Sequence, residues 1–367
     1  MKIVGLIVEY NPFHNGHMHH LQEAKRITNA DLIIAVISTY FSMRGEVSVI
    51  DKYQKARIAI EAGIDLLIEL PYLLGTQNAD LFAENAVKIL SQMGVDTIVT
   101  GSESYDIEYI KKINELESKP HFQSEIKEFL SQGNSYRKSF SLALAKNNHL
   151  DLQANDLLNI KYYDAIKKNQ LPIELQLIKR INNNYHDQTL NSTKIQSATA
   201  LRNTLDIQEY VPTFAYNIYN ERKFMNINAF TDIYNHLILT NDLSQIWQAK
   251  EGIHNRFIAT SSLEELIKEL TSKRYTASRI TRFISYILTN TTQKDLEFES
   301  DYPIRILGFN QKGQEYLNQI KKRVNFFTRL INGIHPIYDF ELKIAKIFSN
   351  TFKEDFVKIE QKLPYRK

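Results

Sequence analysis

The chain of 367 residues contains no cysteine. Disulfide bonds, thiolate metal sites and cysteine nucleophiles are therefore excluded, and the absence is compatible with a reducing cytoplasm. The chain also lacks any stretch approaching the ~18 consecutive apolar residues of a membrane-spanning helix. Its apolar start leads into Glu9, Asn11 and Pro12 rather than a small-residue cleavage site, which is not typical of a signal peptide. We therefore expect a soluble, cytoplasmic protein.

The net charge of the chain is also small. Lysine and arginine number 45 against 42 aspartates and glutamates, which gives a net charge of +3. A balance this mild does not by itself indicate a nucleic-acid partner, so that argument depends on local clusters. The length is typical of two domains.

The first hundred residues alternate between short apolar runs and segments of helical periodicity. The expected strands are Lys2–Val8, Asp31–Ser38, Asp65–Leu70 and Asp96–Thr100, and the expected helices are His17–Thr28, Asp51–Ala62 and Asn78–Met93. Such alternation indicates βαβ units and an α/β fold with a Rossmann-like, doubly wound parallel sheet. In these sheets, ligands bind at the carboxyl ends of the strands.

The pattern changes along the rest of the chain. Residues 105–170 are expected to be mostly helical, Ile173–Ile178 is a further candidate strand, and Ser197–Asn203 is typical of a helix start. Beyond residue 206, strand-like runs become scarce. We therefore predict a first domain over residues 1–205 and a mainly helical second domain over residues 206–367.

The most informative local motif is the H-x-G-H tetrad His14-Asn15-Gly16-His17, which follows a predicted strand and opens a predicted helix. A helix start presents unpaired N–H groups to an anion, and Gly16 allows close approach of the backbone. His14 and His17, three residues apart, can both donate hydrogen bonds to one phosphate group. The tetrad therefore predicts a nucleotide-phosphate site.

Two other interpretations of the tetrad stay open. A histidine-rich helix start need not bind any ligand. The density of His14, His17, His19 and His20 also suggests a metal site. The metal interpretation is less favoured, because Glu9 precedes a rigid Asn-Pro pair and no HExxH-type spacing is present.

The tetrad resembles that of the HxGH nucleotidylyltransferase superfamily, whose members bind ATP at this loop, transfer AMP and release pyrophosphate. A second superfamily signature, ISSTxxR, is similar to Ser197–Arg202 (SATALR). Such a segment offers hydroxyls at a helix start and an arginine fork for phosphates. Alone, SATALR is more often a simple helix cap, and it becomes informative beside the tetrad.

The resemblance extends over most of the chain to the bacterial tRNA(Met) cytidine acetate ligase family. The similar segments are GLIVEYNPFHNGH, Arg44-Gly45-Glu46, Asp65–Pro71, Gly101-Ser102-Glu103, Asn155–Tyr162, Lys179-Arg180-Ile181 with Tyr185-His186-Asp187, SATALR and Lys273–Arg282. One departure is Val47, where the family usually has proline after Arg-Gly-Glu. The departure concerns the rigidity of that loop rather than the chemistry.

This resemblance implies that the chain activates acetate with ATP and passes the acetyl group to N4 of the wobble cytidine of elongator tRNA(Met). Acetate is already ionised and nucleophilic at neutral pH, so positioning and charge stabilisation suffice. His14 and His17 would be catalytic, and Mg²⁺ would be held by carboxylates through water, with no ligand assigned. The implied ATP contacts are Ile7, Val8, Glu9, Tyr10, Asn11, Pro12, Phe13, His14, Asn15, Gly16, His17, His20, Gly101, Asn155, Arg180, Ser197, Thr199 and Arg202.

Simpler roles remain open for several of these residues. Asn155 could be a helix N-cap, Arg180 a surface arginine and Gly101 a turn glycine. Arg44 could contact either a phosphate or RNA.

Two basic clusters lie in the predicted second domain. Lys273, Arg274, Arg279 and Arg282 are the predicted RNA-binding residues, and a further basic run comprises Lys321, Lys322, Arg323 and Arg329 beside Phe326 and Phe327. Basic side chains contact phosphates and aromatics stack on unpaired bases. A solvated helix face with core phenylalanines is the alternative. With the resemblance, the clusters predict that residues 206–367 bind tRNA.

Two other functions stay open. One is an adenylyltransferase that makes a dinucleotide-type cofactor from ATP and a small phosphorylated substrate, which would not need the second half of the chain. The other is a non-catalytic RNA-binding protein with a relic nucleotide site.

Overall fold

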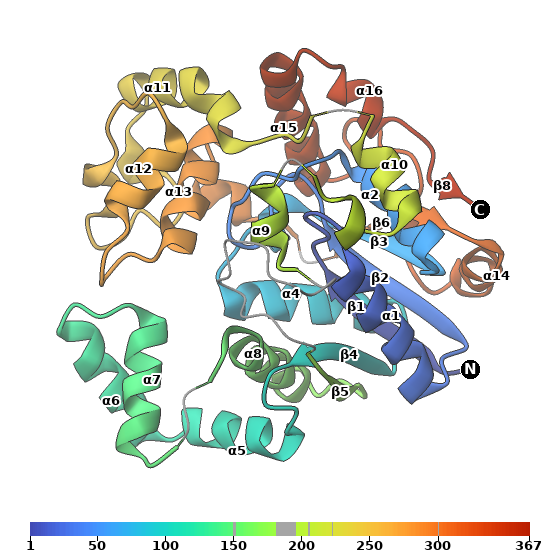
Figure 1. Cartoon of the computed structure of the whole chain (residues 1–367), viewed down its shortest axis with the longest axis horizontal. Coiled ribbons are helices and arrows are strands. Elements are labelled where there is room, and N and C mark those ends of the chain that lie inside the picture. The colour runs from blue at the N-terminus through green and yellow to red at the C-terminus, as the bar shows by residue number, and fades with distance from the viewer. Residues whose placement is uncertain (150–151, 181–195, 205, 222, 300) are drawn as a thin grey trace.

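The computed structural model describes residues 1–149, 152–180, 196–204, 206–221, 223–299 and 301–367 (Figure 1). Its strands are β1 (Ile3–Val8), β2 (Leu32–Ser38), β3 (Leu66–Leu70), β4 (Thr97–Ser102), β5 (Glu174–Lys179), β6 (Ile304–Phe309), β7 (Phe326–Phe327) and β8 (Tyr365–Arg366). They form one sheet of order β5-β4-β1-β2-β3-β6-β7, with β8 paired to β6. Strands β1 to β5 are mutually parallel, which confirms the expected doubly wound arrangement.

Helices cover both faces of this sheet. They are α1 (Asn15–Thr28), α2 (Lys52–Ala62), α3 (Tyr72–Gly75), α4 (Ala79–Gln92), α5 (Ile107–Glu117), α6 (Pro120–Ser131), α7 (Tyr136–Lys146), α8 (Ala154–Lys168), α9 (Ala198–Arg202), α10 (Thr213–Tyr219), α11 (Thr231–Thr240), α12 (Leu263–Leu270), α13 (Ala277–Thr289), α14 (Gln311–Ile320), α15 (Pro336–Phe352) and α16 (Phe356–Glu360). As predicted, Asp51 caps α2 by accepting hydrogen bonds from the Tyr53 and Gln54 N–H groups.

The composition of the strands explains the two-sided packing. Every residue of β2 is buried, as expected for a parallel strand covered on both faces. One face packs with Phe82 of α4 and Ile160 of α8, and the other with Leu21 of α1 and Ala59 of α2. The central strands therefore lie between two apolar layers, and their carboxyl ends are held rigidly.

Three strands of the sheet were not predicted, namely the short β7 and β8 and the longer β6. β6, which lies beyond residue 206, pairs antiparallel with β3. It carries the fully buried Arg305, whose guanidinium forms ion pairs with Glu69 and Glu360. Lys52 joins the same carboxylates and Glu341 in this buried ionic cluster. The proposed division between residues 205 and 206 stays a prediction, with the sheet drawing strands from both sides of it.

Candidate functional site

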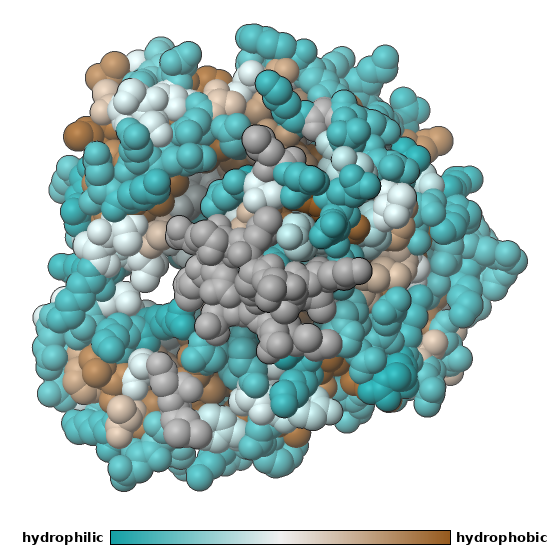
Figure 2. Space-filling view, in the orientation of Figure 1, coloured by the Kyte–Doolittle hydropathy of each residue, from teal (hydrophilic) through white to brown (hydrophobic). Residues whose placement is uncertain are grey.

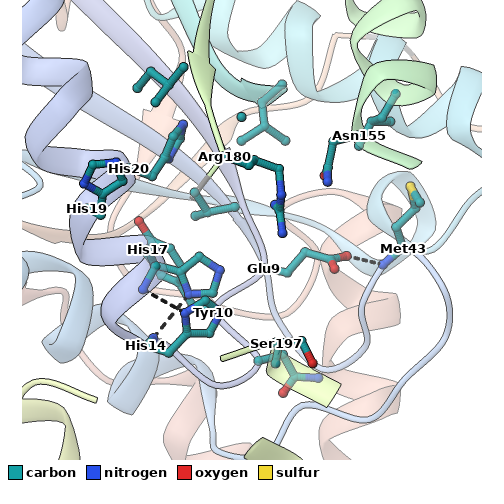
Figure 3. A pocket seen from close by; sticks show the side chains of 18 of the residues that line it. Glu9, Tyr10, His14, His17, His19, His20, Met43, Asn155, Arg180 and Ser197 are labelled. Atoms are coloured by element: carbon teal, nitrogen blue, oxygen red, sulfur yellow. Dashed lines mark hydrogen bonds between the residues drawn. The ribbon is translucent and has the colours of Figure 1, made fainter. Parts of the chain in front are cut away.

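A cavity opens at the carboxyl ends of β1, β4 and β5, on either side of the point where the strand order reverses (Figure 3). This is where doubly wound sheets bind ligands. The residues expected to contact ATP that line it are Ile7, Val8, Glu9, Tyr10, Asn11, His14, Gly16, His17, His20, Gly101, Asn155, Arg180, Ser197 and Arg202. The fold thus brings residues from five separate segments of the sequence into one site.

Four of the expected contacts do not line this cavity. They are Pro12, Phe13, Asn15 and Thr199. Phe13 is fully buried, and its N–H donates to the Tyr219 hydroxyl at 2.7 Å. Asn15 donates its side-chain amide to the Glu209 carbonyl, and the Thr199 hydroxyl accepts from Arg202. In this structure, these residues support the loops around the cavity.

The structure also adds residues to the cavity wall. None of them is among the predicted ATP contacts, although His19 belongs to the possible metal set and Arg44, Glu46, Leu158, Tyr162, Lys179 and Ala198 lie in segments that carry the resemblance; the others are Met43, Phe82, Ile178 and Gln196. Phe82, Leu158 and Tyr162 lie on α4 and α8, whose apolar spacing in the sequence looks the same as that of core residues. Only the position of those helices identifies them as cavity residues.

His14 and His17 together cap helix α1. The Nδ1 atom of His14 accepts a hydrogen bond from the Gly16 N–H at 3.0 Å, and Nδ1 of His17 accepts from the His14 N–H at 3.3 Å. The two rings stack with centroids 3.8 Å apart. A neutral imidazole that accepts at Nδ1 carries its proton on Nε2. The cap therefore selects one tautomer for both rings and leaves two Nε2–H donors for the cavity.

Burial keeps both rings neutral. Desolvation, with the nearby Arg180 charge adding to it, lowers the pKa of His14 to about 3. The pKa of His17 is also far below its usual value because of burial and the His14, His20 and Arg180 charges. Hydrogen bonds to a charged phosphate are stronger than those between neutral groups. Neutral donors here can bind such an anion without the cost of holding a buried charge before it arrives.

Packing around Tyr10 holds the ring of His17. Tyr10 follows a strand end with a φ angle of 47°, which is uncommon for a residue with a side chain. Its ring lies 4.9 Å from the ring of His17 and 4.7 Å from that of Phe13. The backbone turn thus places an aromatic support behind the catalytic candidate.

Glu103 connects the two polar residues on the other side of the cavity. Its Oε1 atom accepts from Asn155 Nδ2 at 2.5 Å and lies 3.5 Å from Arg180 Nε. Its Oε2 atom accepts from the Asp156 N–H at 3.3 Å. Asn155 is not the helix cap, because Gln153 occupies that position in α8. The side chains of Asn155 and Arg180 are thereby fixed relative to each other.

The loop containing Arg44-Gly45-Glu46 is anchored to the first strand turn. Glu9 accepts from the Met43 N–H at 2.6 Å and lies 3.7 Å from Arg44. Arg202 of α9 donates to the Asn11 carbonyl at 2.7 Å and to Glu46 at 2.8 Å. These contacts join the tetrad loop, the Arg-Gly-Glu loop and the SATALR helix into one unit.

Ser197 and Gly101 fit this unit in different ways. Ser197 caps the short helix α9 by accepting from the Ala200 N–H at 3.1 Å, so the predicted helix start is confirmed. A Cβ atom added to Gly101 would lie 3.2 Å from the Arg180 side chain. A larger residue at Gly101 would therefore crowd Arg180.

The predicted RNA-binding residues have unequal environments. Lys273 and Arg274 are exposed. Arg279 and Arg274 lie 3.0 and 3.6 Å from the Glu251 carboxylate. Arg282 is only partly exposed and donates to the Met43 carbonyl at 3.4 Å, so it contacts the cavity wall instead of facing outward.

The second basic run is exposed at Lys321, Lys322 and Arg323 after α14. Phe326 and Phe327 form β7, and the Phe327 ring packs 4.8 Å from that of Tyr338. Ile181 and Tyr185-His186-Asp187, which carry part of the resemblance, lie outside the described residues. Among the residues that the structure describes, no helix has the length and apolar character needed to cross a bilayer.

Comparison with known proteins gives a consistent result. The family model for HIGH Nucleotidyl Transferase matches residues 1–362. The tRNA(Met) cytidine acetate ligase of Caldicellulosiruptor saccharolyticus is 35% identical over 381 residues, covering 96% of this chain and 95% of that protein. The protein of the same name from Clostridium perfringens is 36% identical, with 95% of each chain covered.

Solved structures agree over the whole chain. The apo crystal structure of Thermotoga maritima TmcAL superposes with a TM-score of 0.90 at 28% sequence identity, covering 100% of both chains. A crystal structure of that protein bound with alpha-thio ATP gives a TM-score of 0.87 at 27% identity.

Proposed function

The chain belongs to the HIGH nucleotidyl transferase family and, within it, to the tRNA(Met) cytidine acetate ligases; from this membership we propose that it acetylates a tRNA cytidine. In the first step, acetate and ATP give acetyl-adenylate and pyrophosphate. In the second, the N4 amine of the wobble cytidine of elongator tRNA(Met) takes the acetyl group, and AMP and a proton are released. The observation that carries this proposal is the histidine cap, with two Nε2–H donors at a cavity on the first strand-to-helix turn.

The cavity residues suit the first step. The acetate oxygen attacks the α-phosphorus and the bond to the β-phosphate oxygen breaks, so negative charge builds on the phosphate oxygens. His14 and His17 would donate to those oxygens, and preorganised donors of this kind contribute about 3–4 kcal/mol each. Arg180 and Arg202 line the same cavity and would neutralise the departing pyrophosphate.

A magnesium ion that accompanies ATP would fit this site through water. Glu9 and Glu46 are the cavity carboxylates in the described chain. Each already lies against an arginine, Arg44 or Arg202. Glu9 and Glu46 would therefore contact the magnesium ion through water molecules, and Mg²⁺ retains several waters in most sites. Its chemistry would be to offset charge on the triphosphate.

For the second step we propose a cytoplasmic location, together with the tRNA substrate. The amine of cytidine attacks the acetyl carbonyl, and AMP leaves. Lys273, Arg274 and Arg279 are the residues of the predicted RNA-binding set that we expect to contact phosphates. Arg282 would instead support the loop at Met43, which lines the cavity.

Pyrophosphate release separates this function from the alternatives. We expect release that depends on acetate and ATP, and acetyl transfer to cytidine when tRNA(Met) is added, detected by mass spectrometry of tRNA nucleosides. Release that ignores acetate but requires a phosphorylated small molecule would support the cofactor-forming adenylyltransferase. No release under any of these conditions would support the relic nucleotide site.

A further inference from the structure

The helical hairpin α6–α7 approaches the segment before α13, although the two are far apart in sequence (Figure 1). The N–H of Ser135, at the start of α7, donates to the Lys273 carbonyl at 3.0 Å. Figure 2 shows an opening between these two parts of the molecule. The contact therefore brings the first residues of α7 next to the predicted RNA-binding segment.

Both segments at this contact are free of acidic residues. Residues 129–149 contain Arg137, Lys138 and Lys146 but no aspartate or glutamate. Residues 270–294 also contain no aspartate or glutamate. Arg137 and Lys138 are exposed, and the neighbouring Tyr136 is 40% exposed. Lys146 pairs with Glu125 and Glu128 of α6, and the Tyr136 hydroxyl donates to Glu117, so the positive charge on the α7 side of this contact comes from Arg137 and Lys138.

On the α13 side, arginines gather around one buried ring. The guanidinium groups of Arg279, Arg256 and Arg274 lie 5.0, 5.3 and 5.8 Å from the centre of the Tyr275 ring. Glu251 pairs with two of them. We call Arg256, Arg274 and Arg279 the Tyr275 arginine cluster. Guanidinium groups ordered in this way lose less freedom on binding phosphate than mobile lysines do.

We propose that Tyr136, Arg137 and Lys138 of α7 form, with Lys273 and the Tyr275 arginine cluster, one continuous surface that binds the single-stranded loop of the tRNA. This proposal rests on the proposed function. The cations on both sides of the Ser135–Lys273 contact bind successive phosphates, and the exposed face of Tyr136 stacks on an unpaired base. The α7 residues are new to this surface, because nothing in their own sequence distinguishes them from a solvated helix end.

The position of the surface connects it to the cavity. Arg282 follows Arg279 by three residues on α13, which is about 4.5 Å along the helix axis. Arg282 donates to the Met43 carbonyl, and Met43 lines the cavity. An RNA loop bound at the arginine cluster therefore lies about one helical turn from the cavity wall. This arrangement allows a neighbouring base to reach the acetyl group while the phosphates stay on the surface.

The test is the full-length double variant Arg137→Ala/Lys138→Ala, measured for tRNA(Met) binding over a range of salt concentrations. Each lost contact to a single-stranded phosphate lowers the salt slope by about 0.7, which corresponds to about fivefold in affinity at 0.1 M salt. We expect the slope to fall by about 1.4 and the affinity to fall about 25-fold. Acetate-dependent ATP–pyrophosphate exchange should remain at the wild-type rate, which also shows that the variant is folded.

The matched control is Lys346→Ala/Lys358→Ala, which removes the same charge from exposed positions on α15 and α16, and these helices lie away from α7 in Figure 1. It should bind tRNA like the wild type. Equal affinity of the α7 variant and the wild type, or equal losses in both double variants, would overturn the proposal.

Two further measurements identify the ligand. Tyr136→Leu should weaken binding of a single-stranded RNA oligonucleotide without changing its salt slope. Competition by polyaspartate as strong as that by the oligonucleotide would show a surface for acidic proteins and would refute RNA binding there. A wild-type protein with neither acetate-dependent exchange nor tRNA binding would instead refute the proposed function.

Discussion

The role of His14 as helix cap and its proposed role as donor to the substrate can be separated by two substitutions. His14→Ala removes the Nδ1 acceptor of the Gly16 N–H and the Nε2 donor together. His14→Asn keeps a short side-chain oxygen that can cap α1, because asparagine is among the best N-cap residues. Its amide ends well short of the position of Nε2. The two variants should therefore differ in stability and agree in their loss of activity.

The magnitudes follow from these two roles. Loss of an N-cap costs about 1 kcal/mol, and unfolding entropy of ~2.1 cal/mol/K per residue converts this to a Tm lower by roughly 1 °C in a chain of this length. Loss of one preorganised donor costs about 3–4 kcal/mol in the transition state, or 10²- to 10³-fold in rate. His14→Asn should recover most of the Tm and almost none of the rate.

The assays are acetate-dependent ATP–pyrophosphate exchange and thermal unfolding, measured on the wild type and both variants. Exchange by His14→Asn within tenfold of the wild-type rate would refute the donor role. A His14→Ala variant with the Tm of the wild type would refute the capping role. Together the two results test whether Nδ1 of His14 caps α1 while its Nε2–H donates to the substrate.

Three further outcomes are expected. Glu103→Ala should raise the KM for ATP about tenfold with kcat nearly unchanged, because Asn155 and Arg180 lose their shared carboxylate, which is worth about 1.4 kcal/mol; an unchanged KM in steady-state kinetics would contradict this. Gly45→Ala should destabilise the protein by about 2–4 kcal/mol in urea unfolding, because φ is 80° and a Cβ would lie 2.4 Å from an α13 backbone atom; wild-type stability would show that the loop yields easily. The pKa of His14 is about 3 in the folded protein and ~6.5 in the unfolded chain, so the unfolded chain binds the proton first as the pH falls. His14 should therefore lower the free energy of unfolding by about 1.4 kcal/mol per pH unit between pH 6.5 and about 3. His14→Asn should remove this contribution to the pH dependence of stability.

Much of the first hundred residues could be predicted from the sequence because local patterns and tertiary structure agree there. The parallel strands are short apolar runs, and Asp51 is both a good cap in sequence and an actual cap in the fold. The H-x-G-H tetrad was informative for the same reason, since its position between a strand and a helix is a local property. These features needed no knowledge of distant contacts.

The features that were missed depend on distant contacts. The strand β6 contains Arg305, a charged residue that local reasoning does not place in a buried strand, and its partner carboxylates come from β3 and α16. The same limit applies to Arg282. It was predicted to bind RNA together with its basic neighbours, yet the Arg-Gly-Glu loop packs against its backbone at Gly45.

The cavity wall formed by α4 and α8 shows the third kind of limit. Phe82, Leu158 and Tyr162 have the spacing of core residues, and no local signal separates a residue that faces a cavity from one that faces a helix. The role of Glu103 could be guessed only as part of a resemblance. Its physical reason, a shared carboxylate between Asn155 and Arg180, required the coordinates.

The buried ionic cluster has a consequence for dividing this protein into fragments. Lys52 and Glu69 belong to the front half of the chain, whereas Arg305, Glu341 and Glu360 come from its last quarter. Removing one side of a buried ion pair typically costs about 3–5 kcal/mol. A fragment that ends before β6 would therefore bury Lys52 and Glu69 without the charges of Arg305, Glu341 and Glu360, so the first and last parts of the chain are expected to fold as one unit.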